Sequence, residues 1–254
     1  RAIGAVPEGL LIAVTVILVL GMRKILKRNG LVKRLLAVET LGSVTVICTD
    51  KTGTLTEGRM RVSRSEIFDA ERALQTMILC NDLEGPVDIA LWEHARQVLQ
   101  SDPQETVDRN ERLAVELFSS ETKFMITSHA VGGEKINFLK GAPEIILEMC
   151  QLEGEEKNRI LATVEKWAEE GLRLLGLAYR VDGSIENHSG YTWAGLVGME
   201  DPIREGVVDA TRVAHKAGIQ VKMITGDYRK TAEHIARGIG LMNEGDLSLE
   251  GTEI

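Results

Sequence analysis

The seven residues DKTGTLT, from Asp50 to Thr56, constrain the fold of this chain more than any other part of its sequence. They follow the apolar run from Val44 to Cys48, which is typical of a buried parallel strand, and they present one carboxylate in a turn of small hydroxylated residues. An aspartate at the carboxyl end of such a strand can attack phosphate and form an acyl-phosphate, which divides one difficult phosphoryl transfer into two easier steps. Asp-Lys-Thr-Gly is also an ordinary turn sequence, but a seven-residue match directly after a strand is far more specific.

The residues next to Asp50 fit the same chemistry. Lys51 adds a positive charge, and Gly53 allows the backbone to approach a phosphate closely. Thr52 and Thr54 offer oxygen atoms, while the crowded negative charge of a phosphoryl transfer also calls for a metal ion. We therefore predict a catalytic turn that includes Asp50, Lys51 and Thr52, in which Asp50 and Thr52 bind magnesium.

A second predicted strand, Gln220 to Ile224, leads into another turn of phosphate-binding character and then into a helix. Thr225 can donate its hydroxyl group and Gly226 its amide to phosphoryl oxygens, and the start of the helix adds a favourable dipole. Asp227 can serve as the N-cap of that helix. These three residues complete the predicted catalytic set.

More than one hundred residues separate the two strands, which is too many for a loop and enough for an inserted domain. The helix predicted from Val207 to Ala217 leads into the second strand and gives the β-α-β order of a nucleotide-binding sheet. We therefore expect the two strands to build one α/β sheet. The insertion, from about Arg61 to Gly195, alternates strand and helix patterns.

The composition is compatible with packed α/β structure and argues against other classes. A chain of 254 residues with 44% hydrophobic residues is long enough for about two domains. Its net charge of -8 argues against a nucleic-acid partner, because binding to a phosphate backbone needs a basic face. Its three cysteines lack metal or disulfide spacing, which is typical of a reducing compartment.

The first part of the chain has the pattern of a membrane segment. Ile3 to Met22 supplies about 20 mostly apolar residues, enough for a helix across the roughly 30 Å hydrocarbon core of a bilayer. Arg23 to Arg34 then carries six Lys and Arg and no acid, which predicts that residues after about 23 are cytoplasmic. A cleaved signal peptide would carry its charges before the apolar run and a cleavage site after it.

Pro7 and Glu8 interrupt this apolar run, and both are costly at membrane depth. The proline leaves carbonyl oxygens without helical partners, and these can join the Glu8 carboxylate around a hard cation. The predicted ligands of this cation are Ile3, Gly4, Val6 and Glu8. The alternative is that Glu8 lies at the edge of the membrane.

Five further motifs occur along the chain. They are PEGL at Pro7–Leu10, FSSETK at Phe118–Lys123, KGAPE at Lys140–Glu144, DPIR at Asp201–Arg204 and ITGD at Ile224–Asp227. Together with DKTGTLT, their order resembles that of the P-type ATPases, cation pumps that phosphorylate themselves on the Asp of DKTGT. The resemblance runs from Ile3 to about Ile239 and is closest to the type II subgroup, which contains calcium pumps and sodium/potassium pumps.

The resemblance implies a haloacid-dehalogenase-like (Rossmann-type) α/β phosphorylation domain, split by an α+β nucleotide-binding domain and preceded by a transmembrane helix. On this basis we expect the helix and a cytoplasmic stalk in residues 1–30, the first part of the phosphorylation domain in 31–60, the nucleotide-binding domain in 61–195 and a truncated second part in 196–254. The family's GDGVNDAP and TGES motifs are missing from the sequence. We therefore expect an internal fragment of a multi-pass pump that cannot complete a catalytic cycle alone.

The resemblance also implies which residues bind the nucleotide: Asp88, Phe118, Lys123, Lys140, Gly141, Arg173 and Arg204. Phe118 would stack on adenine, and Lys140 would line the adenine pocket. The resemblance also implies that Asp227 approaches the nucleotide, the alternative to its role as an N-cap. Each assignment has a structural alternative. Phe118 can be buried in a strand, Asp88 can favour a helix N-terminus, and Arg204 can form a hinge salt bridge.

The predicted function is ATP-driven transport of a cation across a membrane through an aspartyl-phosphate on Asp50. Calcium is favoured because a Glu with several carbonyl oxygens suits a hard divalent ion, and a sodium/potassium-type pump is the alternative. A soluble phosphatase of the dehalogenase superfamily is a second class, although those enzymes carry a second acid where this chain has Thr52. A degenerate nucleotide-binding module is a third. The expected partners are ATP, magnesium, the cation, the bilayer and the remaining pump segments.

Overall fold

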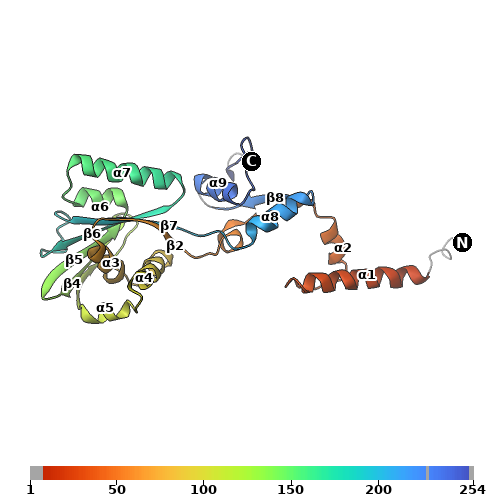
Figure 1. Ribbon diagram of the computed structural model, residues 1–254, viewed down its shortest axis with the longest axis horizontal. Coiled ribbons are helices and arrows are strands. Elements are labelled where there is room, and N and C mark those ends of the chain that lie inside the picture. The colour runs from red at the N-terminus through yellow and green to blue at the C-terminus, as the bar shows by residue number, and fades with distance from the viewer. Residues whose placement is uncertain (1–7, 227–228, 252–254) are drawn as a thin grey trace. The chain divides into compact units, whose positions relative to one another are not determined.

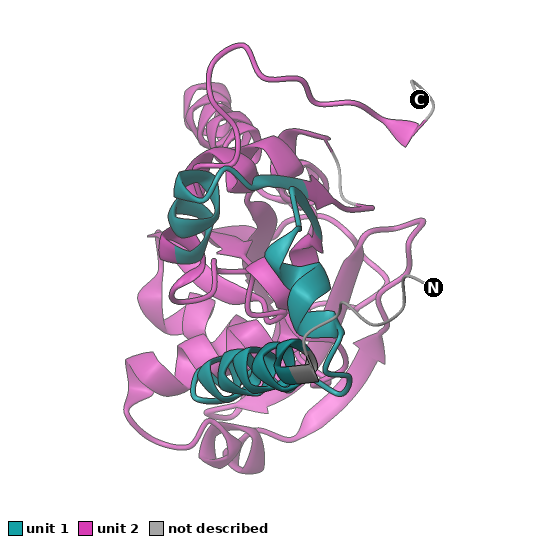
Figure 2. Ribbon diagram, turned by 90° about the vertical axis from the view of Figure 1, so that its right-hand side faces the viewer, with its two compact units in different colours: residues 1–48, 210–222 teal, residues 49–209, 223–254 magenta. Residues whose placement is uncertain are grey.

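The computed structural model describes residues 8–226 and 229–251 and divides the chain into two compact units (Figure 2). One unit contains residues 1–48 and 210–222, and the other contains residues 49–209 and 223–254. Each unit therefore combines segments that are distant in the sequence. The four segments expected from the family resemblance remain predictions.

The larger unit contains a six-stranded antiparallel sheet with strand order β2-β7-β6-β5-β4-β3 (Figure 1). Its strands are β2 (Arg61–Ile67), β3 (Arg112–Glu116), β4 (Phe124–Val131), β5 (Glu134–Gly141), β6 (Arg173–Val181) and β7 (Thr192–Glu200). The first residue of β2 pairs with the last residue of β7, Arg61 with Glu200. The chain thus enters and leaves this sheet at one place, as an inserted domain must.

Helices cover both faces of this sheet (Figure 1). On one face lie α3 (Ala70–Leu79), α4 (Pro86–Leu99) and α5 (Gln104–Arg109), and on the other lie α6 (Pro143–Met149) and α7 (Gly154–Glu169). Local sequence signals mark the first turns of three of these helices. Asp69 caps α3 by accepting a hydrogen bond from the amide of Arg72 at 3.0 Å, and a proline stands in the first turn of α4 and of α6. The insertion has the mixed helix-and-strand character predicted for it.

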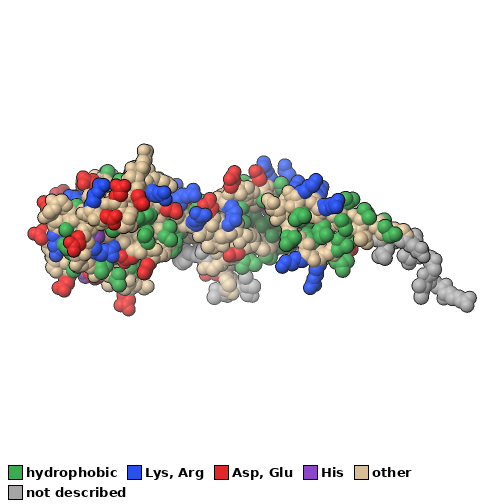
Figure 3. Space-filling model, turned by 90° about the horizontal axis from the view of Figure 1, so that it is seen from below, with side chains coloured by type: hydrophobic (Ala, Val, Ile, Leu, Met, Phe, Trp, Pro, Cys, Tyr) green, Lys and Arg blue, Asp and Glu red, His purple; other side chains and the backbone are tan. Residues whose placement is uncertain are grey.

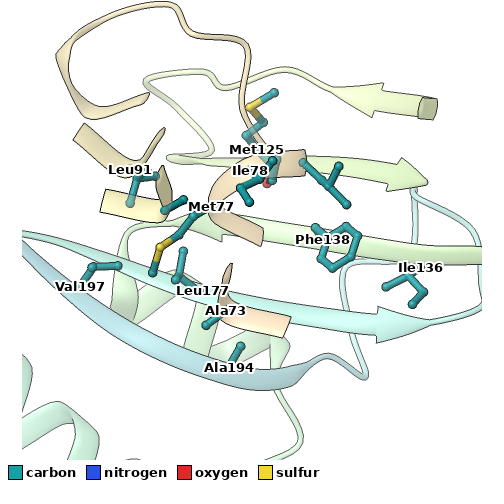
Figure 4. Close-up of a cluster of buried hydrophobic side chains, with 13 residues drawn as sticks. Ala73, Met77, Ile78, Leu91, Met125, Ile136, Phe138, Leu177, Ala194 and Val197 are labelled. Atoms are coloured by element: carbon teal, nitrogen blue, oxygen red, sulfur yellow. Dashed lines mark hydrogen bonds between the residues drawn. The ribbon is translucent and has the colours of Figure 1, made fainter. Parts of the chain in front are cut away.

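An apolar core lies between each face of the sheet and the helices that cover that face. Successive side chains of a strand point to opposite faces, so one strand serves both cores. In β5, Ile136 and Phe138 belong to the core beneath α3 and α4, whereas Leu139 belongs to the core beneath α6 and α7. Figure 4 shows Met77 of α3 together with side chains from the sheet in the first of these cores. Ile136, Phe138 and Leu139 are fully buried.

Cys80 and Cys150 are expected to resist alkylation in the folded chain, whereas the exposed Cys48 is expected to react. Burial raises the pKa of the Cys80 thiol, and it raises the pKa of Cys150 to about 12. Because the thiolate is the reactive form, these two thiols have little reactive species at pH 8. Mass spectrometry after a brief iodoacetamide pulse should find label on Cys48 alone, and on all three cysteines in denaturant. Rapid labelling of Cys80 without denaturant would contradict its placement.

The two strands predicted to pair across the insertion do so. β1 (Val46–Asp50) and β8 (Gln220–Ile224) form a two-stranded sheet, with α8 (Val207–Lys216) before β8 and α9 (Arg229–Gly238) after it. The expectation that the first strand is buried is wrong, because four of the five residues of β1 are exposed. In the described part of the chain this sheet has only two strands, and such a ribbon buries little apolar surface.

The smaller unit contains α1 (Glu8–Leu26) and α2 (Ala37–Gly42). Its surface carries exposed hydrophobic and basic side chains, as Figure 3 shows on one face. Among the described residues, no helix is both long and apolar enough to cross a bilayer, so the predicted transmembrane helix is not confirmed. The apolar part of α1 is shortened by Glu8 at its start and by Arg23 and Lys24 in its last turn. Three predicted ion ligands, Ile3, Gly4 and Val6, lie outside the described residues.

Candidate functional site

A buried ion pair joins two of the residues predicted to bind nucleotide. Lys140, near the end of β5, donates from Nζ to Oδ1 of Asp88 on α4 at 2.5 Å. Only 6% of the Lys140 side chain and 12% of the Asp88 side chain are exposed. Because both charges are withdrawn from water, each depends on the other for compensation. The pair therefore holds the Lys140 ammonium group in one place.

The loop before α4 keeps Asp88 in position. Asn81 donates from Nδ2 to the carbonyl oxygens of Met77 at 3.0 Å and of Asp88 at 2.9 Å. The second carboxylate oxygen of Asp88 accepts a hydrogen bond from the amide of Asp82 at 3.2 Å. Asp88 also lies in the first turn of α4, where the helix dipole favours a negative charge, as the structural alternative for this residue requires. No sequence motif marks Asn81.

The turn between β3 and β4 carries Phe118 and Lys123. Phe118 is 58% exposed, so burial in a strand does not account for it. The turn is closed by Ser119, whose Oγ accepts from the amide of Thr122 at 3.0 Å and whose carbonyl accepts from the amide of Lys123 at 2.8 Å. Lys123 has φ 60°, a left-handed conformation that costs energy for a lysine and needs support from its surroundings. The turn thus presents an exposed aromatic ring and an exposed lysine.

Gly141 is expected to tolerate no side chain. A Cβ there would lie 2.5 Å from the carbonyl oxygen of Lys123 and 2.7 Å from Cα of Phe124. Gly141→Ala would therefore push β4 and its preceding turn away from β5, and we expect a loss of about 1–3 kcal/mol in the free energy of unfolding, as for other overpacked positions. Thermal unfolding followed by circular dichroism measures this loss. Gly154→Ala, at a position with open space, is the control, and equal melting temperatures would contradict the packing.

The two predicted phosphate-binding arginines have different surroundings. Arg173 is the exposed first residue of β6. Arg204 donates from Nη2 to the carbonyl oxygen of Gly53 at 2.7 Å, and its amide donates to the carbonyl oxygen of Leu55 at 2.9 Å. Arg204 therefore braces the turn that follows Asp50. Its contact with nucleotide remains a prediction.

Asp50 is the exposed last residue of β1, and the exposed Thr52 follows in the turn. Gly53 has φ 73°, a left-handed conformation that glycine adopts without a steric cost. Behind the turn, the carbonyl oxygen of Lys51 accepts hydrogen bonds from both the amide and the hydroxyl group of Thr56 at 3.1 Å. The turn thus presents the Asp50 carboxylate at the surface.

Asp201 supports this turn from the other end of the insertion. Its carboxylate accepts hydrogen bonds from Oγ1 of Thr56 at 2.6 Å and from the amides of Gly58 at 2.8 Å and Arg59 at 3.2 Å. It therefore ties the chain that enters the six-stranded sheet to the chain that leaves it. The DPIR motif contains this residue, but its hydrogen-bond partners lie more than 140 positions away, so only the folded chain reveals the role.

The predicted site residues fall into two groups in the structure. The first group lies on or beside the six-stranded sheet and contains Asp88, Lys123, Lys140 and Gly141. The ion pair joins Lys140 to Asp88, and the backbone of Lys123 lies close to Gly141. The second group lies at the ends of β1 and β8: Thr225 and Gly226 follow β8, the strand paired with β1, while Asp227 lies outside the described residues.

The two residues predicted to bind magnesium, Asp50 and Thr52, offer oxygen atoms as ligands. Across residues 8–226 and 229–251, no group of three or more His, Cys, Asp or Glu side chains could hold a metal ion. The predicted pair of Asp50 and Thr52 still suits magnesium, which keeps several waters and binds through one or two carboxylates together with substrate phosphates.

The sequence of this chain is similar to those of known proteins. The protein-family model for the P-type ATPase cytoplasmic domain N matches residues 69–206. Calcium-transporting ATPase 1 of Lactococcus lactis is 37% identical over 291 aligned positions, which cover 100% of this chain and 33% of that protein. Calcium-transporting ATPase 1, plasma membrane-type, of Oryza sativa is 35% identical, over 98% of this chain and 29% of that protein. Cation-transporting ATPase pma1 of Synechocystis is 33% identical, over 100% and 35%. The chain spans about a third of the length of these curated relatives.

Proposed function

Because this chain belongs to the P-type ATPase family, we propose that it forms the nucleotide-binding and phosphorylation region of an ATP-driven cation pump. One observation carries the proposal: the exposed carboxylate of Asp50 ends β1, and β1 pairs with β8, whose end leads into Thr225 and Gly226. Open α/β sheets bind their ligands at the carboxyl ends of neighbouring strands. The two turns therefore suit a phosphoryl group between them.

ATP is proposed to bind through the six-stranded sheet. The exposed ring of Phe118 offers an aromatic face for adenine, and the Asp88 carboxylate can accept a hydrogen bond from the adenine amino group. The ion pair with Asp88 fixes the Lys140 ammonium group before nucleotide arrives, which lowers the ordering cost of binding. Gly141 leaves room for the base, while Lys123 is proposed to meet the triphosphate.

Arg173 and Arg204 are the further proposed phosphate contacts. A guanidinium group suits this role because its planar fork matches phosphate oxygens. Arg173 is exposed on β6, whereas Arg204 already donates to the backbone of the turn after Asp50. We therefore propose that Arg204 couples phosphate binding to the shape of that turn.

In the proposed reaction, a carboxylate oxygen of Asp50 attacks the γ-phosphorus of ATP, and ADP leaves with the bridging oxygen. The Thr225 hydroxyl group and the Gly226 amide would donate hydrogen bonds to the phosphoryl oxygens, and Lys51 would offset part of their charge. Magnesium, held by Asp50 and Thr52, would supply further charge neutralisation when bound. Asp227 is proposed to approach the nucleotide or to cap α9.

Thr52 favours a pump over a soluble phosphatase. Dehalogenase-superfamily phosphatases use a second acid at this position to activate water, and a threonine lacks that capacity at neutral pH. The acyl-phosphate on Asp50 would therefore persist long enough to drive a change of conformation.

Calcium is the proposed ion and a membrane the proposed location. Two of the relatives are named calcium-transporting ATPases, one of them of plasma membrane type. A carboxylate with several backbone carbonyl groups, the donor set predicted at residues 3–8, suits a hard divalent cation. The Synechocystis relative is named only as cation-transporting, and sodium or potassium is the alternative.

The test is phosphorylation of the complete gene product from labelled ATP while calcium, sodium and potassium are titrated separately. We expect acid-stable label that rises with calcium alone. Label that follows sodium or potassium would change the ion and keep the pump. Label indifferent to all three would contradict ion-driven phosphorylation.

A further inference from the structure

The loop between β6 and β7 contacts the two strand ends that flank the turn carrying Phe118 and Lys123. We propose that His188, on this loop, is a positioning residue that holds the turn in its nucleotide-binding shape. The proposal rests on the ATP site proposed above. It adds a residue that none of the sequence motifs contains.

His188 contacts both ends of the turn. Its Nε2 lies 2.8 Å from Oε2 of Glu116, the last residue of β3, and forms a hydrogen bond with it. Its imidazole ring packs edge-to-face on Phe124, the first residue of β4, with ring centroids 5.0 Å apart and an interplanar angle of 73°. One side chain therefore links the residue where the chain enters the turn to the residue where it leaves.

The loop that carries His188 is held by Arg180 on β6. The Arg180 guanidinium group donates hydrogen bonds to the carbonyl oxygens of Ser184 and Ser189 at 2.5 Å and of Asn187 at 2.7 Å. It also lies over the ring of the buried Tyr191, 4.7 Å from its centroid. A planar guanidinium group with several fixed acceptors orders the loop with little further loss of entropy. His188 therefore lies on a loop whose backbone is held in place by Arg180.

The turn needs such a support because β3 is an edge strand. Within residues 8–226 and 229–251, β3 pairs with β4 alone, and elements with one partner open more readily than central strands. Phe118 stands two residues after Glu116, and Lys123 directly precedes Phe124. Movement at either end would therefore displace the ring and the charge proposed to meet the nucleotide. A turn already held in place costs less to order on binding.

Isothermal titration of the 254-residue chain with ATP tests the proposal. His188→Ala is expected to raise Kd about fivefold, the equivalent of one net hydrogen bond. Glu116→Ala should have a similar or smaller effect. The double variant should bind ATP no more weakly than His188→Ala alone, because His188→Ala already removes the hydrogen bond that Glu116→Ala removes. Glu186→Ala, at an exposed position of the same loop, is the matched control and should leave Kd unchanged.

Two further variants separate positioning from folding. His188→Phe keeps an aromatic ring on Phe124 and removes the hydrogen bond, so it should weaken ATP binding with little change in melting temperature. His188→Gln keeps a donor for Glu116 and should restore part of the affinity. Unchanged Kd in His188→Ala and His188→Phe, or additive effects of the His188 and Glu116 changes, would overturn the inference while wild-type binding stands. Failure of the wild-type chain to bind ATP would overturn the proposed site and the inference with it.

Discussion

Asp50→Asn is expected to abolish acid-stable phosphorylation of the complete pump. The side-chain amide has nearly the same size as the carboxylate, but it cannot form an acyl-phosphate. We expect the initial rate of labelling from ATP to fall by roughly a thousandfold or more, as when other enzymes lose a catalytic nucleophile. Gel analysis after an acid quench measures the label. Hydroxylamine should release this label from the wild-type protein.

The exposed position of Asp50 makes this variant informative, because the change should leave the fold intact. Glu57→Gln is the matched control. Glu57 is a nearby carboxylate that pairs with Arg61 at 3.2 Å and has no proposed part in the chemistry. It should retain full labelling. Persistent acid-stable label in Asp50→Asn would show that another residue is the nucleophile.

Lys140→Ala is expected to destabilise the six-stranded domain by about 3–5 kcal/mol, because it leaves the Asp88 carboxylate buried without a charge partner. It should also remove measurable ATP affinity, since Lys140 is proposed to line the adenine pocket. Urea unfolding followed by circular dichroism measures the first effect. A second variant, Lys140→Met with Asp88→Asn, removes both charges and should recover much of the stability without recovering ATP binding.

The exposed ion pair of Arg109 and Glu105 provides the control. Its groups are 3.1 Å apart, but 76% and 60% of their side chains are exposed. Arg109→Ala should therefore cost less than about 1 kcal/mol. A comparable loss in Lys140→Ala and Arg109→Ala would contradict the special role of the buried pair.

Elements with strong local signals were predictable from the sequence. The predicted strand from Gln220 to Ile224 coincides with β8, because this short segment stands between a glycine-terminated helix and a glycine turn. Pro143 begins α6 as predicted, since proline suits the first turn of a helix. The position of Lys140, near the end of the strand that directly precedes this helix, was predictable as well.

Distances between remote side chains were not predictable. The family resemblance assigns Asp88 and Lys140 to one site, but nothing in their spacing of 52 residues indicates a direct ion pair. The partners of Asp201 and the contacts of His188 likewise arise only when strands pair. The burial expected for the strand before Asp50 is wrong for a related reason: burial depends on what covers a strand, and β1 has one partner in the described chain.

We propose that this chain binds ATP through its six-stranded domain. Titration of the isotopically labelled 254-residue chain with ATP, followed by amide chemical shifts, tests this most directly. We predict saturable shifts that are largest at Phe118, Lys123, Lys140 and Gly141, and that vanish in Lys140→Met with Asp88→Asn. The absence of saturable shifts, or saturable shifts confined to residues outside that domain, would contradict it.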